Sequence, residues 1–110
     1  MDKAQGVVAL GALAQATRLD IFRYLVQIGA EGAAAGQIGE RFQLPLPTLS
    51  FHLKTLQQAG LIQRVRQSRS LIYSADMMAI KTLVGYLTEN CCEGRPEVCG
   101  WPPAREASQL

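Results

Sequence analysis

The stretch PLPTLSFHLKTLQQAGLIQRVRQSRSLIYS, residues 45–74, changes its hydrophobic period halfway along, and this change decides the fold. Three leucines in its first half recur at helical spacing: Leu49, Leu53 and Leu56. Pro47 suits the first position of that helix, and Gly60 ends it. In the second half, residues 61–67 and 70–74 are rich in β-branched and aromatic residues. They are separated by two residues, which predicts a two-stranded hairpin.

The rest of the chain is predicted to be mostly helical. Upstream, the apolar spacing indicates one helix near the N-terminus, a second from about Thr17 to Gly29, and a short third over residues 33–42, which a turn follows. The apolar positions of the first two helices are Val7, Leu10, Leu13 and Ala14, then Leu19, Phe22 and Val26, with Ile21, Leu25 and Ile28 beside them. Downstream, Asp76 or Ser74 caps a last helix. The apolar stripe of that helix is Met77, Ile80, Val84 and Leu87.

This succession of helices, a short turn, a further helix and a hairpin before the last helix is the order of a winged helix-turn-helix. It is a mainly α fold with a small β-hairpin. In this fold the second helix of the helix-turn-helix presents its outer face to the DNA major groove. A rotation of about 100° per residue directs one set of side chains outward: Thr48, Ser50, Phe51, Lys54, Thr55 and Gln58. Hydroxyl groups, amides and one cation suit base edges and phosphates, and Phe51 suits the methyl group of thymine.

The hairpin adds three cations to this surface. Arg64 and Arg66 lie on one face of its first strand, and Arg69 lies in its turn. Such side chains suit backbone phosphates or the minor groove. The hairpin is therefore predicted to be the wing that flanks the DNA.

Composition and charge are those of one small domain. The chain has 110 residues and a net charge of +2. Residues 34–74 hold five basic residues against one acidic residue, a local charge of +4, whereas residues 75–110 carry −2. The uncharged runs fall short of the roughly 20 apolar residues of a membrane span, and no basic stretch precedes an apolar run as in a secretory signal. We therefore expect a cytoplasmic protein with one domain over residues 1–90 and a flexible tail over residues 91–110.

Short motifs in the central region are more specific. They are Ser50-x-His52-Leu53-Lys54-x-Leu56, then Ala59-Gly60-Leu61-Ile62, then an arginine-rich wing that ends at Tyr73. Together with LAQATRLDIFRYL (residues 13–25), they resemble the ArsR/SmtB family of bacterial metal-responsive repressors, over residues 8–90. The resemblance implies a homodimer built on the first and last helices. It also implies repression by binding to double-stranded operator DNA, and release when a metal or metalloid binds.

The resemblance also assigns DNA-reading positions. Pro47, Ser50 and Phe51 match positions at which the family contacts bases, and Phe51 departs from the polar residue that is usual there. With the helix face and the wing, the predicted DNA-binding residues are Pro47, Thr48, Ser50, Phe51, Lys54, Arg64, Arg66 and Arg69.

All three cysteines lie just past the last helix, in NCCEGRPEVC (residues 90–99): Cys91, Cys92 and Cys99. Many arsenic-type members of the family place cysteines at the start of the third helix instead, where this chain has none. The C-terminal arrangement resembles the three-cysteine As(III) site of a subset of the family. Three soft thiolates suit pyramidal As(III) or Sb(III), whereas a structural zinc site takes four ligands. Cys91 is expected to continue the apolar stripe four residues after Leu87, so that ligand binding would pull on the dimer helix.

Other roles for the thiols stay open. Cys99 paired with Cys91 or Cys92 would make a redox-sensing repressor, and the same thiols suit other soft metals such as Cd or Pb. Adjacent cysteines are also often small buried apolar residues.

An enzyme is not expected. The spacing of Cys99 and Arg105 is that of a phosphate-binding loop, but the two prolines between them lack backbone N–H groups. His52, the one histidine, is expected to be a packed, hydrogen-bonded helix residue. The sequence thus predicts a repressor with As(III) or Sb(III) as inducer. It predicts no organic cofactor, no membrane partner and no small-molecule substrate.

Overall fold

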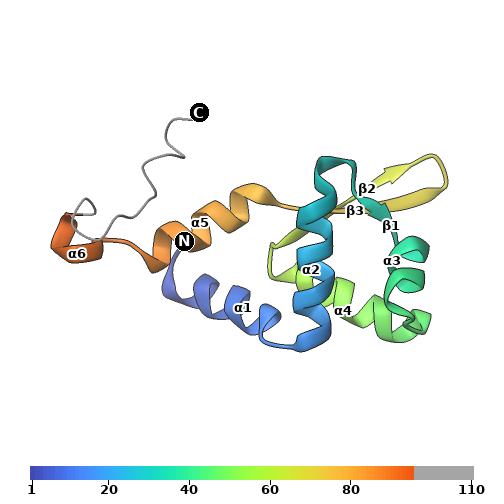
Figure 1. Cartoon of the computed structure of the whole chain (residues 1–110), viewed down its shortest axis with the longest axis horizontal. Helices are drawn as coiled ribbons and strands as arrows, with labels where there is room; N and C mark the ends of the chain where they lie inside the picture. Colours follow the sequence, from blue (N-terminus) through green and yellow to red (C-terminus); the bar gives the residue numbers. More distant parts are fainter. Residues whose placement is uncertain (96–110) are drawn as a thin grey trace.

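The computed structural model describes residues 1–95, which form a helical body and a projecting wing (Figure 1). The helices are α1 (Lys3–Leu13), α2 (Ala16–Ile28), α3 (Ala35–Phe42), α4 (Leu46–Gln58), α5 (Met77–Leu87) and the single turn α6 (Cys91–Gly94), with a 3-10 turn η1 (Gly29–Glu31). The strands are β1 (Ala33–Ala34), β2 (Ile62–Gln67) and β3 (Ser70–Ala75). This is the predicted winged helix-turn-helix. No helix within residues 1–95 is long and apolar enough to cross a membrane.

Side-chain caps explain where several helices begin. At α1 the Asp2 carboxylate accepts the Gln5 backbone N–H at 2.8 Å, and the Gln5 side chain accepts the Asp2 N–H in return. At α5 the Asp76 carboxylate accepts the N–H groups of Met78 and Ala79, which confirms one of the two predicted caps. At α2 the Gln15 side chain fills the same role.

The wing contains one strand more than predicted. β2 and β3 form the expected antiparallel hairpin, and β1 pairs antiparallel with the other edge of β3, giving the order β1-β3-β2. Ala33 and Ala34 pair with Tyr73 and Ile72, so α3 begins at Ala35 and the prediction that it begins at residue 33 is wrong. Two strand residues are too few to show an alternating pattern, and their pairing depends on residues far along the chain.

The core lies where α2, α3 and α4 meet the base of the sheet. Its largest fully buried side chains are Ile21, Leu25, Ile38, Leu49, Leu56 and Leu61. The predicted inner face of α4 is confirmed, since Leu53 is buried with Leu49 and Leu56. The first apolar stripe predicted for α2 is only partly buried, because Leu19 is exposed and the helix rotates Ile21 and Leu25 into the core instead.

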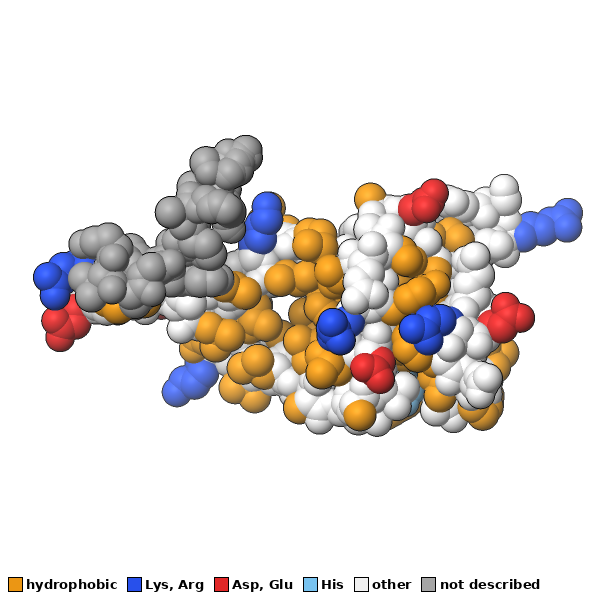
Figure 2. Space-filling view, in the orientation of Figure 1, with side chains coloured by type: hydrophobic (Ala, Val, Ile, Leu, Met, Phe, Trp, Pro, Cys, Tyr) orange, Lys and Arg blue, Asp and Glu red, His pale blue; other side chains and the backbone are white. Residues whose placement is uncertain are grey.

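α1 and α5 present apolar side chains to solvent at the end of the molecule away from the wing (Figures 1 and 2). α1 buries small residues, Gly6, Ala9 and Ala12, and exposes large ones. The large apolar side chains that these two helices expose are Val7, Val8, Leu10, Met77, Met78 and Leu87. Several large apolar side chains exposed on adjacent helices are typical of a protein interface.

One polar contact joins α4 to the corner between α1 and α2. Arg18 donates from Nε to the carbonyl oxygen of Ala12 at 2.7 Å, and its Nη1 lies 3.4 Å from Nδ1 of His52. Because a guanidinium only donates, Nδ1 accepts and the neutral ring carries its proton on Nε2. Burial lowers the pKa of His52, and the Arg18 charge lowers that pKa further. The expectation of a packed, hydrogen-bonded histidine is confirmed.

Replacing Gly32 by alanine is expected to destabilise the fold. Gly32 has a φ of +70°, and a Cβ there would lie 2.5 Å from the Tyr73 carbonyl oxygen. We expect Gly32→Ala to lower the free energy of unfolding by about 1–3 kcal/mol, the usual cost of such backbone strain, with the clash in addition. Gly36→Ala is the matched control, because nothing lies within 4 Å of its added Cβ. Urea denaturation at one protein concentration measures the free energy of unfolding of both variants. Equal stability of the two variants would contradict the requirement for glycine at position 32.

His52 is expected to make stability depend on pH. Its pKa is lower in the folded chain than the 6.5 of the unfolded chain. As pH falls through 6.5 the unfolded chain therefore binds the proton first, and the free energy of unfolding decreases until the folded pKa is passed. Between pH 7.5 and 5 the wild type should lose more stability than His52→Asn. Because the chain has one histidine, urea denaturation across this range isolates the effect. Parallel pH profiles for the two proteins would show that His52 contributes nothing.

Candidate DNA-binding surface and thiol pair

The outer face of α4 is exposed and carries no acidic residue. Ser50, Phe51 and Lys54 are exposed, while Leu49 and Leu53 on the opposite side are buried. Thr48 is exposed in the first turn of the helix. The side chains that the sequence assigns to the DNA-reading face therefore do lie on one accessible surface.

α4 begins one residue earlier than the sequence suggests. Pro45 is its N-cap and its carbonyl oxygen accepts the Leu49 N–H at 3.0 Å, so Pro47 occupies the second helical position, not the first. Pro47 is tolerated there because the first N–H groups of a helix have no partner within it. This start also brings an unpredicted residue to the surface, since Leu46 is 65% exposed.

A groove joins α4 to the wing. It encloses about 730 Å³ and is lined by Ser50, Lys54, Gln57, Gln58, Arg64, Leu71 and Tyr73. Arg64 and Arg66 pair with Tyr73 and Leu71 across the hairpin, and directly opposed residues share a face of a sheet. The side of the wing that bears these arginines is thus the side that borders α4. Gln57 is not among the predicted residues, and it lines the groove because the hairpin places Arg64, Leu71 and Tyr73 beside the last turn of α4.

Arg69 lies at the tip of the wing. The hairpin turn places Ser68 at a φ of +56°, as two-residue hairpin turns require of a central residue. All four predicted cations of the surface, Lys54, Arg64, Arg66 and Arg69, are exposed. They can therefore meet a polyanion without prior rearrangement.

Cys91 and Cys92 form a close thiol pair. Their sulfur atoms lie 3.6 Å apart, and both side chains are half-buried. Asn90, Cys92 and Glu93 have φ between +53° and +58°, so the backbone of this turn is left-handed. Cys99 lies outside the described residues. Within residues 1–95, no group of three His, Cys, Asp or Glu side chains that could hold a metal ion is present.

The prediction that Cys91 continues the stripe of the last helix is wrong. α5 ends at Leu87, Thr88 is its C-cap, and the left-handed Asn90 intervenes before Cys91. The thiol pair is nevertheless only a few residues from the end of α5.

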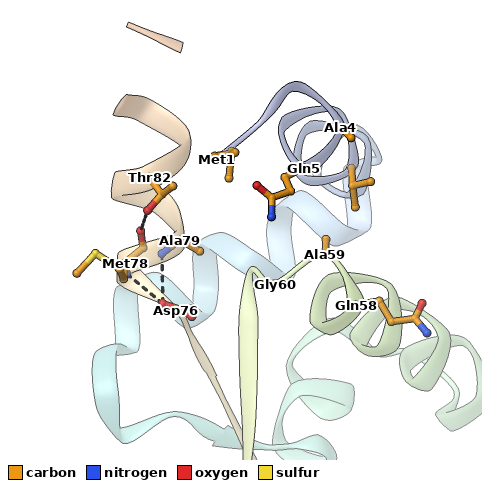
Figure 3. A pocket seen from close by; sticks show the side chains of 11 residues that line it. Met1, Ala4, Gln5, Gln58, Ala59, Gly60, Asp76, Met78, Ala79 and Thr82 are labelled. Atoms are coloured by element: carbon orange, nitrogen blue, oxygen red, sulfur yellow. Dashed lines mark hydrogen bonds between the residues drawn. The ribbon is translucent and has the colours of Figure 1, made fainter. Parts of the chain in front are cut away.

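The start of α5 borders the end of α4. A groove between them is lined by Met1, by Ala4 and Gln5 of α1, by Gln58, Ala59 and Gly60, and by Met78, Ala79 and Thr82 of α5 (Figure 3). Asp76, which caps α5, also donates its backbone N–H to the Leu61 carbonyl oxygen at 2.9 Å. α5 therefore runs from the end of α4 toward the thiol pair.

Residues 13–65 match a family described as a helix-turn-helix domain. The chain is 36% identical over 77 residues to the uncharacterized HTH-type transcriptional regulator YceK of Bacillus subtilis, covering 69% of this chain and 76% of the relative. It is 26% identical to the transcriptional activator HlyU of Vibrio cholerae, over 84% of this chain and 82% of HlyU.

Solved structures show the same fold. An ArsR-like transcriptional regulator from Rhodococcus superposes with a TM-score of 0.73 at 23% identity, over 87% of this chain and 88% of its own. The homodimeric winged helix-turn-helix DNA-binding domain of a possible ArsR-family regulator from Mycobacterium bovis has a TM-score of 0.63 at 26% identity. The match covers 83% of this chain and 84% of that domain. Both are described as transcriptional regulators, and the second is described as a DNA-binding domain. The chain therefore belongs to the HTH-type transcriptional regulators, and its fold is the one seen in ArsR-type regulators.

Proposed function

We propose that the protein is a homodimeric cytoplasmic repressor that leaves its operator when As(III) or Sb(III) binds Cys91, Cys92 and Cys99. The observation that carries the DNA-binding part is the groove in which Lys54 and Ser50 of α4 meet Arg64 of the wing. The observation that carries the sensing part is the pair of sulfur atoms 3.6 Å apart.

In the DNA complex, α4 lies in the major groove and the wing follows the phosphate backbone. Lys54 and the wing arginines lie on the two sides of one groove, so they neutralise phosphates that flank the bases beneath α4. The absence of acidic residues from α4 avoids repulsion at this surface.

The dimer forms through α1 and α5. Their exposed apolar side chains would be covered by the same helices of a second copy, as in a self-complementary two-fold interface. The Mycobacterium relative, which is described as homodimeric, supports a homodimer but does not identify its interface. A dimer of this kind presents its two α4 helices to half-sites one DNA turn apart, about 34 Å.

The thiol pair fits a soft ion. In a pyramidal three-thiolate site with ion–sulfur bonds of about 2.3 Å and angles of about 100°, neighbouring sulfur atoms lie roughly 3.5 Å apart. The 3.6 Å between Cys91 and Cys92 is close to this spacing, so one ion can contact both sulfurs with little movement. The left-handed backbone at Cys92 is of the strained kind that clusters at functional sites. Cys99, seven residues further on, supplies the third thiolate.

Ligand binding is coupled to DNA through α5. The thiols follow the C-terminal end of α5, and its N-terminal end borders the end of α4 through Asp76 and the groove of Figure 3. A shift of α5 would therefore move the dimer face and change the contacts of α5 with the end of α4. Coupling of about 1–3 kcal/mol would reduce DNA affinity by about 5–150-fold.

Replacing Arg64 and Arg66 by alanine should weaken operator binding. For each phosphate that the variant no longer neutralises, the slope of log K against log salt concentration should become shallower by about 0.9. The control variant, Arg23→Ala with Lys81→Ala, removes the same charge from exposed positions on α2 and α5. It should leave the operator affinity and the salt slope nearly unchanged. Fluorescence anisotropy at several salt concentrations measures them. If the two double variants behave alike, the wing is not the phosphate-binding element.

Arsenite should release the wild type from DNA but not the cysteine variants. Cys99→Ser, and Cys91→Ser with Cys92→Ser, should bind the operator like wild type without ligand and lose the response to arsenite and antimonite. Parallel titrations with Cd(II), Pb(II), Zn(II) and peroxide test the rival sensors. Release by peroxide, reversed by dithiothreitol, would replace the proposal with a redox switch. An undiminished arsenite response in both variants would rule out these thiols as the site.

The direction of regulation needs its own assay, because the HlyU relative is named an activator. A reporter gene behind the operator should be expressed at a higher level when the regulator gene is deleted. Lower expression in the deletion strain would make the protein an activator and leave the DNA-binding part intact.

A further inference from the structure

We infer that α4 reads the methyl groups of thymine, with Phe51 as the residue that determines specificity. This inference rests on the proposed function only in that α4 must contact operator DNA. It concerns which chemical feature of the bases is recognised.

Phe51 is an exposed aromatic ring in the centre of the recognition helix. Its side chain is 62% exposed, and its one ring contact among the described residues is the edge of the neighbouring His52 ring, at 5.8 Å between centroids. A phenyl ring neither donates nor accepts the hydrogen bonds that distinguish guanine, adenine and cytosine. The apolar feature of the major groove is the C5-methyl group of thymine.

Thr55 extends this apolar surface. It lies four residues after Phe51 and thus on the same side of the helix, and its hydroxyl donates to the Phe51 carbonyl oxygen at 3.0 Å. Because the hydroxyl group is hydrogen-bonded to the backbone, the methyl group of Thr55 is the part of the side chain that can contact DNA. Pro47, four residues before Phe51 and exposed, continues the row in the other direction.

Polar groups lie beside this row. Ser50 and Lys54 border the groove shared with Arg64 of the wing, where phosphates are expected. Phosphate contacts set the register of the helix, and the apolar row then faces the base edges. The absence of acidic residues from α4 and the cations on its flank favour DNA over a protein partner for this patch.

The row also predicts a spacing. Residues four apart on a helix are separated by about 6 Å along its axis, and successive base pairs are about 3.4 Å apart. Phe51 and Pro47 should therefore reach methyl groups about two base pairs apart. The operator half-site should contain thymines at this separation beneath α4.

Thymine-to-uracil replacement tests the inference, because it removes the methyl group and keeps every hydrogen-bonding group. Duplexes are first selected from a random library with the wild-type protein, and each thymine of the selected site is then replaced singly. At least one replacement should weaken wild-type binding about fourfold, the factor that burial of one methyl group provides.

Two variants make the test specific. Phe51→Ala should bind the thymine duplex more weakly and show no further loss on the sensitive uracil duplex. Leu46→Ala, which removes another exposed apolar side chain of α4, should keep the uracil penalty. Phe51 is exposed, so thermal unfolding of its variant should match wild type.

The outcomes separate this inference from the proposed function. The inference is overturned if the wild type selects a sequence but tolerates every uracil replacement. It is also overturned if Phe51→Ala loses as much affinity on the uracil duplex as the wild type does. In both cases the proposal of DNA binding stands. If wild type selects no sequence at all, base recognition by α4 itself is overturned.

Discussion

The contact of Arg18 with Ala12 and His52 holds the recognition helix in place. It joins three elements at one point, since Ala12 is near the end of α1, Arg18 is in the first turn of α2, and His52 is on α4. The leucines of α4 supply apolar burial, but burial alone lets a helix rotate or slide. The leucines turn one face of α4 inward, and the contact with the buried ring adds a directional constraint on that orientation, with Phe51 and Lys54 on the outer side.

α5 connects the parts of the molecule that the function requires. Its N-terminal cap, Asp76, is bonded to the segment that follows α4, its apolar face belongs to the proposed dimer interface, and its C-terminal end leads to Cys91. A ligand at the thiols therefore needs no long chain of contacts to reach the recognition helix. In the proposed mechanism, the coupling would pass from the thiols through residues 88–90 to α5, whose other end borders α4.

The distribution of charge and apolar surface divides the tasks. The wing and α4 carry exposed cations and one apolar row, which suit a polyanion with methyl groups in its groove. α1 and α5 expose aliphatic side chains, which suit a second protein surface. The residues between them, Ile21, Leu25 and Leu56 among them, are fully buried and serve the fold alone. The proposed DNA-binding and dimer surfaces thus lie at opposite ends of this small domain.

Local patterns in the sequence determined the helices, the hairpin, the Asp76 cap and the inner face of α4, because periodicity and capping act between residues a few positions apart. The tertiary structure alone decided what depends on distant partners. β1 exists because Ala33 and Ala34 meet β3, Leu19 is exposed because α2 turns another face inward, and Gln57 joins the groove because the wing folds beside it. The break between α5 and Cys91 likewise depends on a left-handed Asn90, for which the apolar stripe gave no sign. Such features follow from the packing of elements against one another, and no single stretch of sequence contains that information.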